Sequence, residues 1–223
     1  MVIVTQPRSP NAEAFRVLAA NIRYSALVNP LHTLLVTSPM AQEGKSTITA
    51  NLAAALAKAE LRVLVVDADL RKPQQHRLFG VKQGGGLTSA LLDGPVDGRV
   101  NKVEPAGLEI LTSGHLPPNP AEMLGSSRML NLIEELRKQA DIVLIDCPPV
   151  LPVADATILA PHVDGVLLVL RANHTRGRLA MEALESLRKV NAHLVGAVLN
   201  AAPRGKGYHY YSSHDDQTGK PKK

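Results

Sequence analysis

Cysteine is nearly absent from this sequence. Cys147 is the single cysteine among 223 residues, so no disulfide can form within the chain and no cluster of cysteines can bind a metal. We interpret Cys147 as a small packed residue, because its segment offers no basic partner that would activate a thiol. A chain with so little cysteine suits a reducing compartment, and we expect it in the cytoplasm.

Long hydrophobic runs are also missing. The longest uninterrupted aliphatic run covers residues 166–170, whereas a helix needs about 20 apolar residues to cross a bilayer. The first residues lack the charged-then-apolar plan of a signal peptide. These absences predict a soluble chain without a membrane span of its own.

The remaining composition is that of a globular protein. The chain is 45% hydrophobic, which is enough for one domain with a well-buried core. Its formal net charge of +5 favours acidic partners, whether phosphates, anionic lipids or nucleic acid. We expect one folded domain over residues 1–202 and a flexible tail over residues 203–223, because the tail lacks the apolar residues that a core needs.

Six short apolar segments predict the strands of a sheet. Each is rich in branched residues and continuous rather than alternating, which is typical of strands buried on both faces of a parallel sheet. The segments are residues 33–36, 63–66, 108–111, 142–145, 166–170 and 195–199.

Helix-like stretches lie between these segments. The alternation of strand and helix predicts an α/β fold with a doubly wound, mostly parallel sheet, in which a ligand binds at the carboxyl ends of the strands. A separate amphipathic helix over residues 11–27 precedes the first strand. The other predicted helices cover residues 46–59, 128–139, 153–160 and 176–190.

A glycine-lysine-serine sequence lies between the first predicted strand and the next helix. Backbone N–H groups and the positive end of a helix dipole converge at such a place, so it can hold phosphate. Lys45 would bond to the outer phosphates of ATP, and the Ser46 hydroxyl would be a ligand of the accompanying Mg²⁺. The predicted nucleotide-binding residues of the loop are Gln42, Glu43, Gly44, Lys45, Ser46 and Thr47.

This loop departs from the strict pattern G-x-x-x-x-G-K-[ST] at two places. Pro39 occupies the position of the first glycine, and Gln42 occupies a position where such loops often have another glycine. Pro39 removes one N–H but is tolerable at the entrance of the loop. Gln42 must either avoid a positive φ angle or accept strain. For the loop alone, a helix start that binds no ligand is the alternative.

Three carboxylates follow predicted strands. Asp67 and Asp69 follow the second strand, and alternation along an extended segment predicts that both side chains point the same way. Asp146 ends the fourth strand, as a Walker B aspartate does. Each could alone be a turn residue at a strand end. Together with Lys45, they indicate a magnesium site.

These motifs resemble those of the bacterial tyrosine kinase family, whose aliphatic-Asp-x-Asp-x-Arg pattern is called Walker A′. The resemblance covers nearly the whole chain. It implies a P-loop NTPase fold of the deviant Walker, MinD-like type, and ATP-dependent phosphorylation of protein tyrosines in capsule and exopolysaccharide export. The motifs that carry it are Ser9-Pro10, Glu13 to Arg16, Glu43 to Thr47, Asp67 with Asp69 and Arg71, Gly86-Leu87, Leu91-Leu92, Pro117 to Glu122, Asp146 to Pro149, Asp155, and Val198 to Asn200.

The resemblance also implies the roles of the site residues. Lys45 binds the β- and γ-phosphates of ATP, while Ser46 and Asp146 organise magnesium. Asp67 is the base for the tyrosine hydroxyl, and Asp69 supports the metal and its waters. Such a set suffices because phosphoryl transfer needs charge neutralisation and in-line positioning more than covalent help.

Tyrosine is scarce and clustered. Three of the four tyrosines, Tyr208, Tyr210 and Tyr211, fall within four consecutive positions of the predicted tail. No hydrophobic pattern there would bury their rings, so we interpret them as substrates, and the resemblance implies phosphorylation by a neighbouring copy. Each phosphate adds about −1.5 to −2 charges, so we hypothesise that phosphorylation dissolves an assembly. An adhesive or neutral tail is the alternative.

Two kinds of partner follow from the resemblance. The chain is similar to stand-alone family members, which implies a membrane-embedded polysaccharide co-polymerase that activates it and recruits it to the inner face of the cell membrane. Family members also form rings through Glu-x-x-Arg-x-x-Arg. Here Glu13 and Arg16 are followed by Ala19, so self-association would lack one cation. No nucleic-acid partner is expected.

Two other functions are compatible with the same fold. A MinD/ParA-like positioning ATPase would use nucleotide to act on DNA, a membrane or a protein, but such proteins usually carry a lysine five residues before the loop lysine, where this chain has Met40. A catalytically weak nucleotide-binding regulator of polysaccharide export is the third possible function.

Asn200 lies at the end of the last predicted strand. In related ATPases its counterpart approaches the adenine, and we expect the same here.

Overall fold

The computed structural model describes residues 1–94, 96 and 98–203, apart from the side chain of Val28. Its central element is a seven-stranded sheet with the order β3-β4-β2-β5-β1-β6-β7. All described pairings are parallel except that of β3 with β4. The strands are β1 (Thr33–Thr37), β2 (Val63–Asp67), β3 (Asn101–Val103), β4 (Leu108–Leu111), β5 (Ile142–Asp146), β6 (Gly165–Arg171) and β7 (Leu194–Asn200). The predicted doubly wound α/β fold is confirmed.

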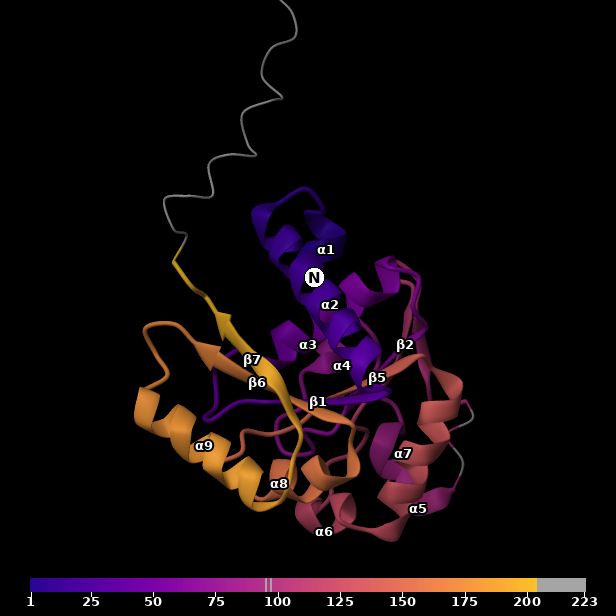
Figure 1. Cartoon of the computed structure of the whole chain (residues 1–223). Coiled ribbons are helices and arrows are strands. Elements are labelled where there is room, and N and C mark those ends of the chain that lie inside the picture. The colour runs from indigo at the N-terminus through magenta and orange to yellow at the C-terminus, as the bar shows by residue number, and fades with distance from the viewer. Residues whose placement is uncertain (95, 97, 204–223) are drawn as a thin grey trace, which may run out of the picture.

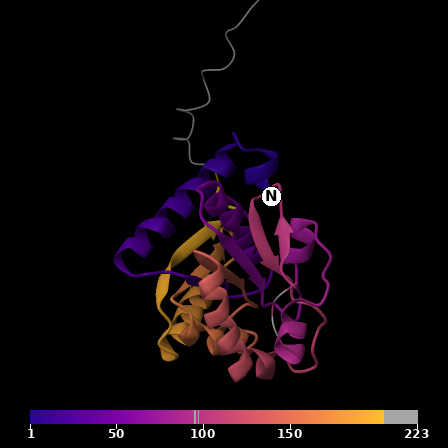
Figure 2. The same cartoon turned by 90° about the vertical axis from the view of Figure 1, so that its right-hand side faces the viewer.

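Helices cover both faces of the sheet (Figure 1). On one face lie α1 (Val2–Thr5), α2 (Pro10–Val28), α3 (Lys45–Lys58) and α4 (Gln75–Phe79). On the other lie α5 (Gly86–Asp93), α6 (Pro120–Leu124), α7 (Ser127–Gln139), α8 (Asp155–Leu159), the 3₁₀ helix η1 (Ala160–His162) and α9 (Gly177–Lys189). Figure 2 shows the same layers from the side, with α2 above the sheet and α7 and α9 below it.

The two hydrophobic cores are built from alternate residues of the same strands. In β1, Leu34 and Val36 pack toward α3, whereas Leu35 packs in the opposite core. Every residue of β1, β2 and β5 is buried, as expected for central parallel strands covered on both sides. Continuous burial of this kind explains why these segments are continuous apolar runs in the sequence.

The last predicted strand differs from this expectation. β7 lies at the edge of the sheet, and its residues are only partly buried. Leu199 is 58% exposed. An edge strand has a neighbour on one side only, so its apolar sequence does not imply burial on both faces.

Several short elements had no clear signal in the sequence. β3 has three residues and pairs antiparallel at the edge of the sheet. The helices α1, α4 and α6 have four or five residues, too few to show a helical period. By contrast, the predicted N-terminal helix is confirmed as α2, and Ser9 caps it by accepting a hydrogen bond from Ala12 N.

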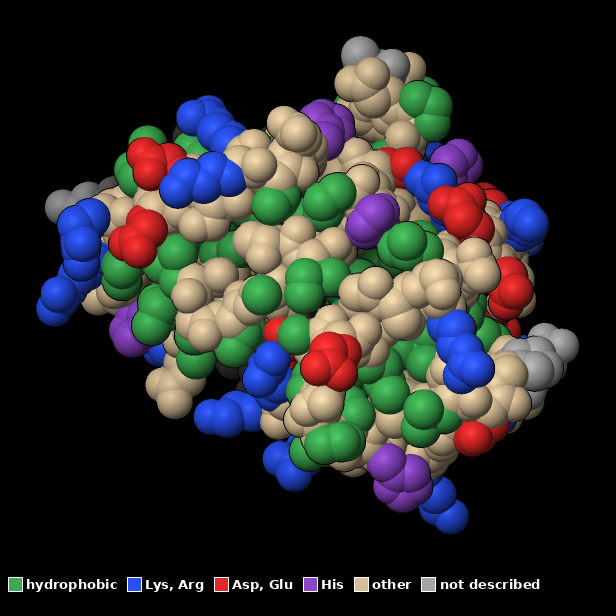
Figure 3. Space-filling view, turned by 90° about the horizontal axis from the view of Figure 1, so that it is seen from below, with side chains coloured by type: hydrophobic (Ala, Val, Ile, Leu, Met, Phe, Trp, Pro, Cys, Tyr) green, Lys and Arg blue, Asp and Glu red, His purple; other side chains and the backbone are tan. Residues whose placement is uncertain are grey.

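The surface carries charges of both signs. Seen from below in Figure 3, several Lys and Arg side chains project from the outline, and hydrophobic side chains lie in small groups among polar ones. Of the helices in the described part of the chain, none combines the length and the apolar character that crossing a bilayer requires.

Candidate functional site

Gly44 begins the site at the turn from β1 into α3. It is the N-cap of α3 and has a φ of 93°, a conformation that favours glycine. A Cβ on Gly44 would also lie 2.1 Å from Asn200 Nδ2, so a side chain here would collide with the end of β7. The 14-residue helix α3 therefore starts with its free N–H groups at the carboxyl edge of the sheet.

Gln42 accepts the strain that its position in the loop predicts. Its φ is 66°, in the left-handed region, where a residue with a Cβ is disfavoured by about 1–2 kcal/mol. The Arg171 guanidinium at the end of β6 donates a hydrogen bond to Gln42 C=O at 3.0 Å. This contact helps hold the strained turn in place.

The buried side chain of Glu43 stabilises the same loop by hydrogen bonds. It is 1% exposed, and its carboxylate accepts hydrogen bonds from Met40 N at 3.1 Å and from the Thr175 hydroxyl at 2.6 Å. Its carbonyl accepts a bond from Asn200 Nδ2 at 2.9 Å. The predicted site residue Asn200 thus reaches the loop, and its amide contacts the loop backbone.

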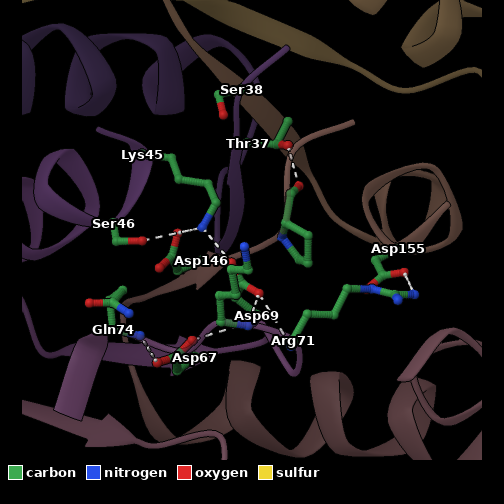
Figure 4. A network of polar contacts seen from close by, with 12 residues as sticks. Thr37, Ser38, Lys45, Ser46, Asp67, Asp69, Arg71, Gln74, Asp146 and Asp155 are labelled. Carbon is green, nitrogen blue, oxygen red and sulfur yellow. Dashed lines mark hydrogen bonds and ion pairs between the residues drawn. The ribbon is translucent and has the colours of Figure 1, made fainter. Parts of the chain in front are cut away.

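Strand order brings the carboxylates and Lys45 together. β5 lies between β2 and β1, and its last residue, Asp146, is in register with Asp67 of β2 and with Val36 of β1. Lys45, the first residue of α3, turns its side chain toward them (Figure 4). Residues predicted separately from three places in the sequence, the loop with Lys45 and the ends of two strands, therefore share one centre.

The centre is a buried cluster of charges. Lys45 Nζ lies 2.7 Å from Asp69 Oδ2 and 3.6 Å from Asp146 Oδ1. The Lys45 side chain is 11% exposed and that of Asp69 is 6% exposed, while Asp67 and Asp146 are fully buried. One ammonium group is thus paired with two carboxylates, and Asp67 lies beside Asp146 as a third, which leaves negative charge in excess.

This excess shifts two pKa values. Burial lowers the pKa of Lys45, but the negative charges of Asp146 and Asp69 outweigh it and raise that pKa above its ordinary value. Burial, with the neighbouring charge of Asp146, raises the pKa of Asp67 to about 8. Lys45 therefore stays charged, and Asp67 can exchange a proton near neutral pH.

Backbone N–H groups orient the two Walker A′ carboxylates. Asp67 Oδ2 accepts bonds from Gln74 N at 3.1 Å and Gln75 N at 2.9 Å. Asp69 Oδ1 accepts a bond from Lys72 N at 2.8 Å, which leaves its other oxygen to Lys45. The segment between β2 and α4 therefore folds around the two carboxylates.

Three further residues of the site, Arg71, Asp155 and Gln75, were not predicted as site residues. The Arg71 guanidinium makes a bidentate pair with Asp155, with distances of 2.9 and 2.8 Å, and Asp155 is fully buried. Arg71 and Asp155 both belong to motifs that carry the family resemblance, so those motifs could have identified them as site residues. Gln75 is buried and donates to Asp146 Oδ2 at 2.8 Å, and no pattern in the sequence singled it out.

The donor set fits a magnesium ion that is shared with phosphate. Across the described residues, no group of three or more His, Cys, Asp or Glu side chains has an arrangement that would hold a metal by itself. Mg²⁺ usually needs only one or two carboxylates, because waters and phosphate oxygens complete its shell. Asp146 Oδ1 is buried, and no described group donates a hydrogen bond to it. Its nearest cation is the Lys45 ammonium at 3.6 Å, which is too far for a hydrogen bond, so this oxygen is suited to a metal cation.

Other predicted residues lie outside this centre. Thr47 is exposed on the first turn of α3. Glu13 and Arg16 form an exposed pair on α2, with Oε2 and NH1 2.6 Å apart. The predicted phosphorylation sites Tyr208, Tyr210 and Tyr211 lie outside the described residues.

Replacing Gln42 by glycine tests the strain in the loop. Gln42→Gly should raise the free energy of unfolding by about 0.5–1 kcal/mol, because glycine relieves the left-handed strain but costs some entropy. Gln42→Ala removes the same side chain and keeps the strain, so it is the matched control. Urea unfolding of the three proteins measures the difference. Equal midpoints for the glycine and alanine variants would show that the loop is unstrained.

The raised pKa of Asp67 predicts a pH-dependent stability of the nucleotide-free protein. The ordinary pKa of 3.8 rises to about 8 in the fold, so the stability that protonated Asp67 contributes is complete below about pH 4 and is lost as the pH rises through 8. Asp67→Asn removes this titration and keeps an oxygen for the backbone N–H groups. As the pH rises from 5 to 9, the free energy of unfolding of Asp67→Asn should increase relative to that of wild type by on the order of 1–3 kcal/mol.

The exposed carboxylate Glu135 supplies the control for that experiment. Glu135→Gln makes the same chemical change at an exposed position on α7, so it controls for the loss of one negative charge. Thermal unfolding across the pH range measures all three proteins. An Asp67→Asn variant that parallels wild type from pH 5 to pH 9 would mean that Asp67 ionises normally.

Comparison with known proteins places this geometry in a family. The ParA family model, described as an NUBPL iron-transfer P-loop NTPase, matches residues 30–205. The septum site-determining protein MinD of Pyrococcus horikoshii, solved with Mg-ADP, has a TM-score of 0.64 at 24% identity and covers 75% of this chain and 69% of its own. That likeness shows the fold alone, and it confirms the MinD-like P-loop architecture.

Closer similarity is found among tyrosine kinases. Tyrosine-protein kinase YwqD of Bacillus subtilis (strain 168) is 38% identical, with 97% of this chain and 92% of YwqD aligned. Putative tyrosine-protein kinase EpsB of Ralstonia solanacearum is 36% identical over 93% of this chain, which corresponds to 28% of EpsB. The crystal structure of the chimerical protein CapA2B2 has a TM-score of 0.87 at 36% identity, covering 91% of this chain and 90% of its own. The chain belongs to the bacterial tyrosine-protein kinase family, and it has the P-loop NTPase fold of the ParA group.

Proposed function

We propose that this chain is an ATP-dependent protein-tyrosine kinase that transfers the γ-phosphoryl group of ATP to tyrosine side chains. The observation that carries the proposal is the buried cluster in which Lys45 faces Asp67, Asp69 and Asp146 at the start of α3. A nucleotide phosphate and a divalent cation are complementary to such a centre, because one binds the lysine and the other neutralises the carboxylates.

ATP would bind with its phosphates at the N-terminus of α3. The free N–H groups of the helix start and the Lys45 ammonium offer charge-assisted hydrogen bonds to the β- and γ-phosphates. Lys45 is paired with Asp69, and a bound phosphate would compete with that carboxylate for the lysine. Asn200 would contribute at the adenine side of the same loop.

Magnesium would be held by Ser46, Asp69 and Asp146. When bound with ATP, Mg²⁺ neutralises phosphate charge and so lowers the cost of bringing the nucleotide close to the carboxylates. Asp146 presents the oxygen that receives no hydrogen bond from the described groups. Asp69 is already oriented by the Lys72 backbone N–H.

Asp67 would accept the proton of the tyrosine hydroxyl. The new bond joins the tyrosine oxygen to the γ-phosphorus, the bond from that phosphorus to the β,γ-bridging oxygen breaks, and ADP leaves with the bond electrons. A carboxylate whose pKa is raised to about 8 accepts a proton more readily than an ordinary aspartate does. Hydrogen bonds from Gln74 N and Gln75 N fix the carboxylate in place.

The proposed substrates include the chain itself. Tyr208, Tyr210 and Tyr211 would be phosphorylated by a neighbouring copy, as the family resemblance implies. The exposed residues Glu13 and Arg16 on α2 would contribute to self-association. Relatives named as tyrosine-protein kinases support this substrate class, and a function in capsular or exopolysaccharide synthesis and export is proposed with it.

An activating partner in the membrane is part of the proposal. EpsB contains the matched region as 28% of its length, so in that relative the kinase-like part is joined to a much longer chain. For the present chain, we propose that a separate membrane-embedded polysaccharide co-polymerase provides activation. It would recruit the kinase from the cytoplasm to the inner face of the cell membrane.

Phosphopeptide mass spectrometry tests the kinase. After incubation with ATP and Mg²⁺, with and without candidate activator segments, phosphate should be found on at least one of Tyr208, Tyr210 and Tyr211. Lys45→Met should reduce it at least about 100-fold, because a charge-assisted contact to the transferring phosphate is lost. Lys58→Met is the matched control, since Lys58 is an exposed lysine at the far end of α3.

The other outcomes identify the alternatives. ATP hydrolysis without phosphotyrosine would contradict the kinase and indicate a ParA-like positioning ATPase. Binding of ATP without any turnover, again with activator present, would indicate a regulator of polysaccharide export. Equal labelling of the Lys45→Met and Lys58→Met variants would show that the labelling arises elsewhere.

A further inference from the structure

We propose that Gln75 is a positioning residue of the metal and nucleotide centre, which holds Asp146 and offers a buried acceptor to metal-bound water. The inference rests on the proposed use of Mg²⁺ with ATP and deepens it. Gln75 is the first residue of α4 and is 0% exposed. A fully buried amide side chain needs hydrogen-bond partners, and those of Gln75 lie in the nucleotide site.

The amide nitrogen of Gln75 joins two motifs. Nε2 donates to Asp146 Oδ2 at 2.8 Å and to Ser46 C=O at 3.1 Å. Both partners are acceptors, so the nitrogen and not the oxygen must face them, which settles the orientation of the amide. The side chain therefore connects the Walker B strand to the first turn of the phosphate-binding helix.

The backbone of the same residue joins a third motif. Gln75 N donates to Asp67 Oδ2 at 2.9 Å. One residue thus contacts Asp67 through its backbone and Asp146 and Ser46 through its side chain. A shift of α4 would move all three contacts together.

Two buried oxygens of this network receive no hydrogen bond, although the Lys45 ammonium lies 3.6 Å from one of them, Asp146 Oδ1. Gln75 Oε1 and Asp146 Oδ1 are both buried, and neither accepts a hydrogen bond from any described group. They belong to the two side chains that the Nε2 to Oδ2 bond links. Buried acceptors without donors are uncommon in folded proteins and call for an explanation.

A hydrated divalent cation would satisfy both oxygens. The positive charge suits Asp146 Oδ1, and a water on the cation can donate to Gln75 Oε1. The Nε2 to Oδ2 bond determines which oxygen of Asp146 is left for the metal. Residues that orient a metal ligand in this way typically change metal affinity by about 10- to 100-fold when they are removed.

Replacing Gln75 by methionine tests the inference through binding. Methionine has a similar length but neither donates to Asp146 nor accepts from water. ADP affinity is measured by calorimetry once with Mg²⁺ and once with EDTA. The factor by which Mg²⁺ strengthens ADP binding should fall about 10-fold or more in Gln75→Met, while affinity in EDTA should stay within about 2-fold, a change of under about 0.5 kcal/mol.

Gln74 provides a matched control. It precedes Gln75 and also donates its backbone N–H to Asp67, but its side chain is only partly buried. In Gln74→Met, the factor by which Mg²⁺ strengthens ADP binding should keep its wild-type value. A Gln75→Met variant that loses affinity equally in Mg²⁺ and in EDTA would show a merely structural residue and overturn the inference. So would wild-type ADP binding that does not depend on Mg²⁺.

A second variant keeps the test decisive if Gln75→Met folds poorly. Gln75→Glu preserves the shape of the side chain and places a carboxylate against Asp146, so Mg²⁺ should raise its melting temperature more than that of wild type. An equal or smaller Mg²⁺ effect overturns the inference. Neither ADP affinity nor melting temperature depends on catalysis. A chain that binds Mg²⁺ and ADP as described but transfers no phosphate would refute the proposed kinase activity and leave the role of Gln75 intact.

Discussion

The structure depends on a buried lysine that faces more carboxylates than it can neutralise. Lys45 pairs closely with Asp69 and lies near Asp146, while Asp67 is fully buried beside them. A fold does not bury such an excess of negative charge without cost. Hydrogen bonds from backbone N–H groups and from Gln75 reduce this cost, and so does protonation of Asp67. The excess also explains why a divalent cation and a polyanionic ligand would bind there together.

The sheet creates this situation through strand order. Because β5 lies between β2 and β1, two strands that end in aspartate, β2 and β5, are direct neighbours. The turn proposed to bind phosphate follows β1. The supporting contacts come from outside these strands: Arg171 and Asn200 hold the loop from β6 and β7. On the other side, Arg71 joins the Walker A′ segment to Asp155 at the start of α8. The site is therefore fixed by elements from most of the chain.

The sequence predicted the parts of this arrangement that are local. Asp67 and Asp146 end apolar runs, and Lys45 lies in a recognisable loop, so their meeting follows from parallel strands that share one carboxyl edge. Contacts set by tertiary packing were beyond reach, since Gln75 lies in a five-residue helix without a helical period. β3 was missed because two of its three residues are polar, so the segment shows no apolar run, and it is a strand only through its pairing with β4. For Gln42 the sequence predicted either a negative φ angle or a strained positive one. Only the backbone shows that the φ angle is positive.

The central claim is that the Lys45 cluster holds excess negative charge that a divalent cation relieves. Its most direct test is a titration of the nucleotide-free protein with Mg²⁺ at pH 8, followed by thermal unfolding, with Asp146→Asn and Glu135→Gln measured beside wild type. The melting temperature of wild type and of Glu135→Gln should rise with Mg²⁺, and that of Asp146→Asn should start higher and rise little, because one charge of the cluster is gone. A melting temperature that Mg²⁺ leaves unchanged in wild type, or raises equally in all three proteins, would contradict the claim.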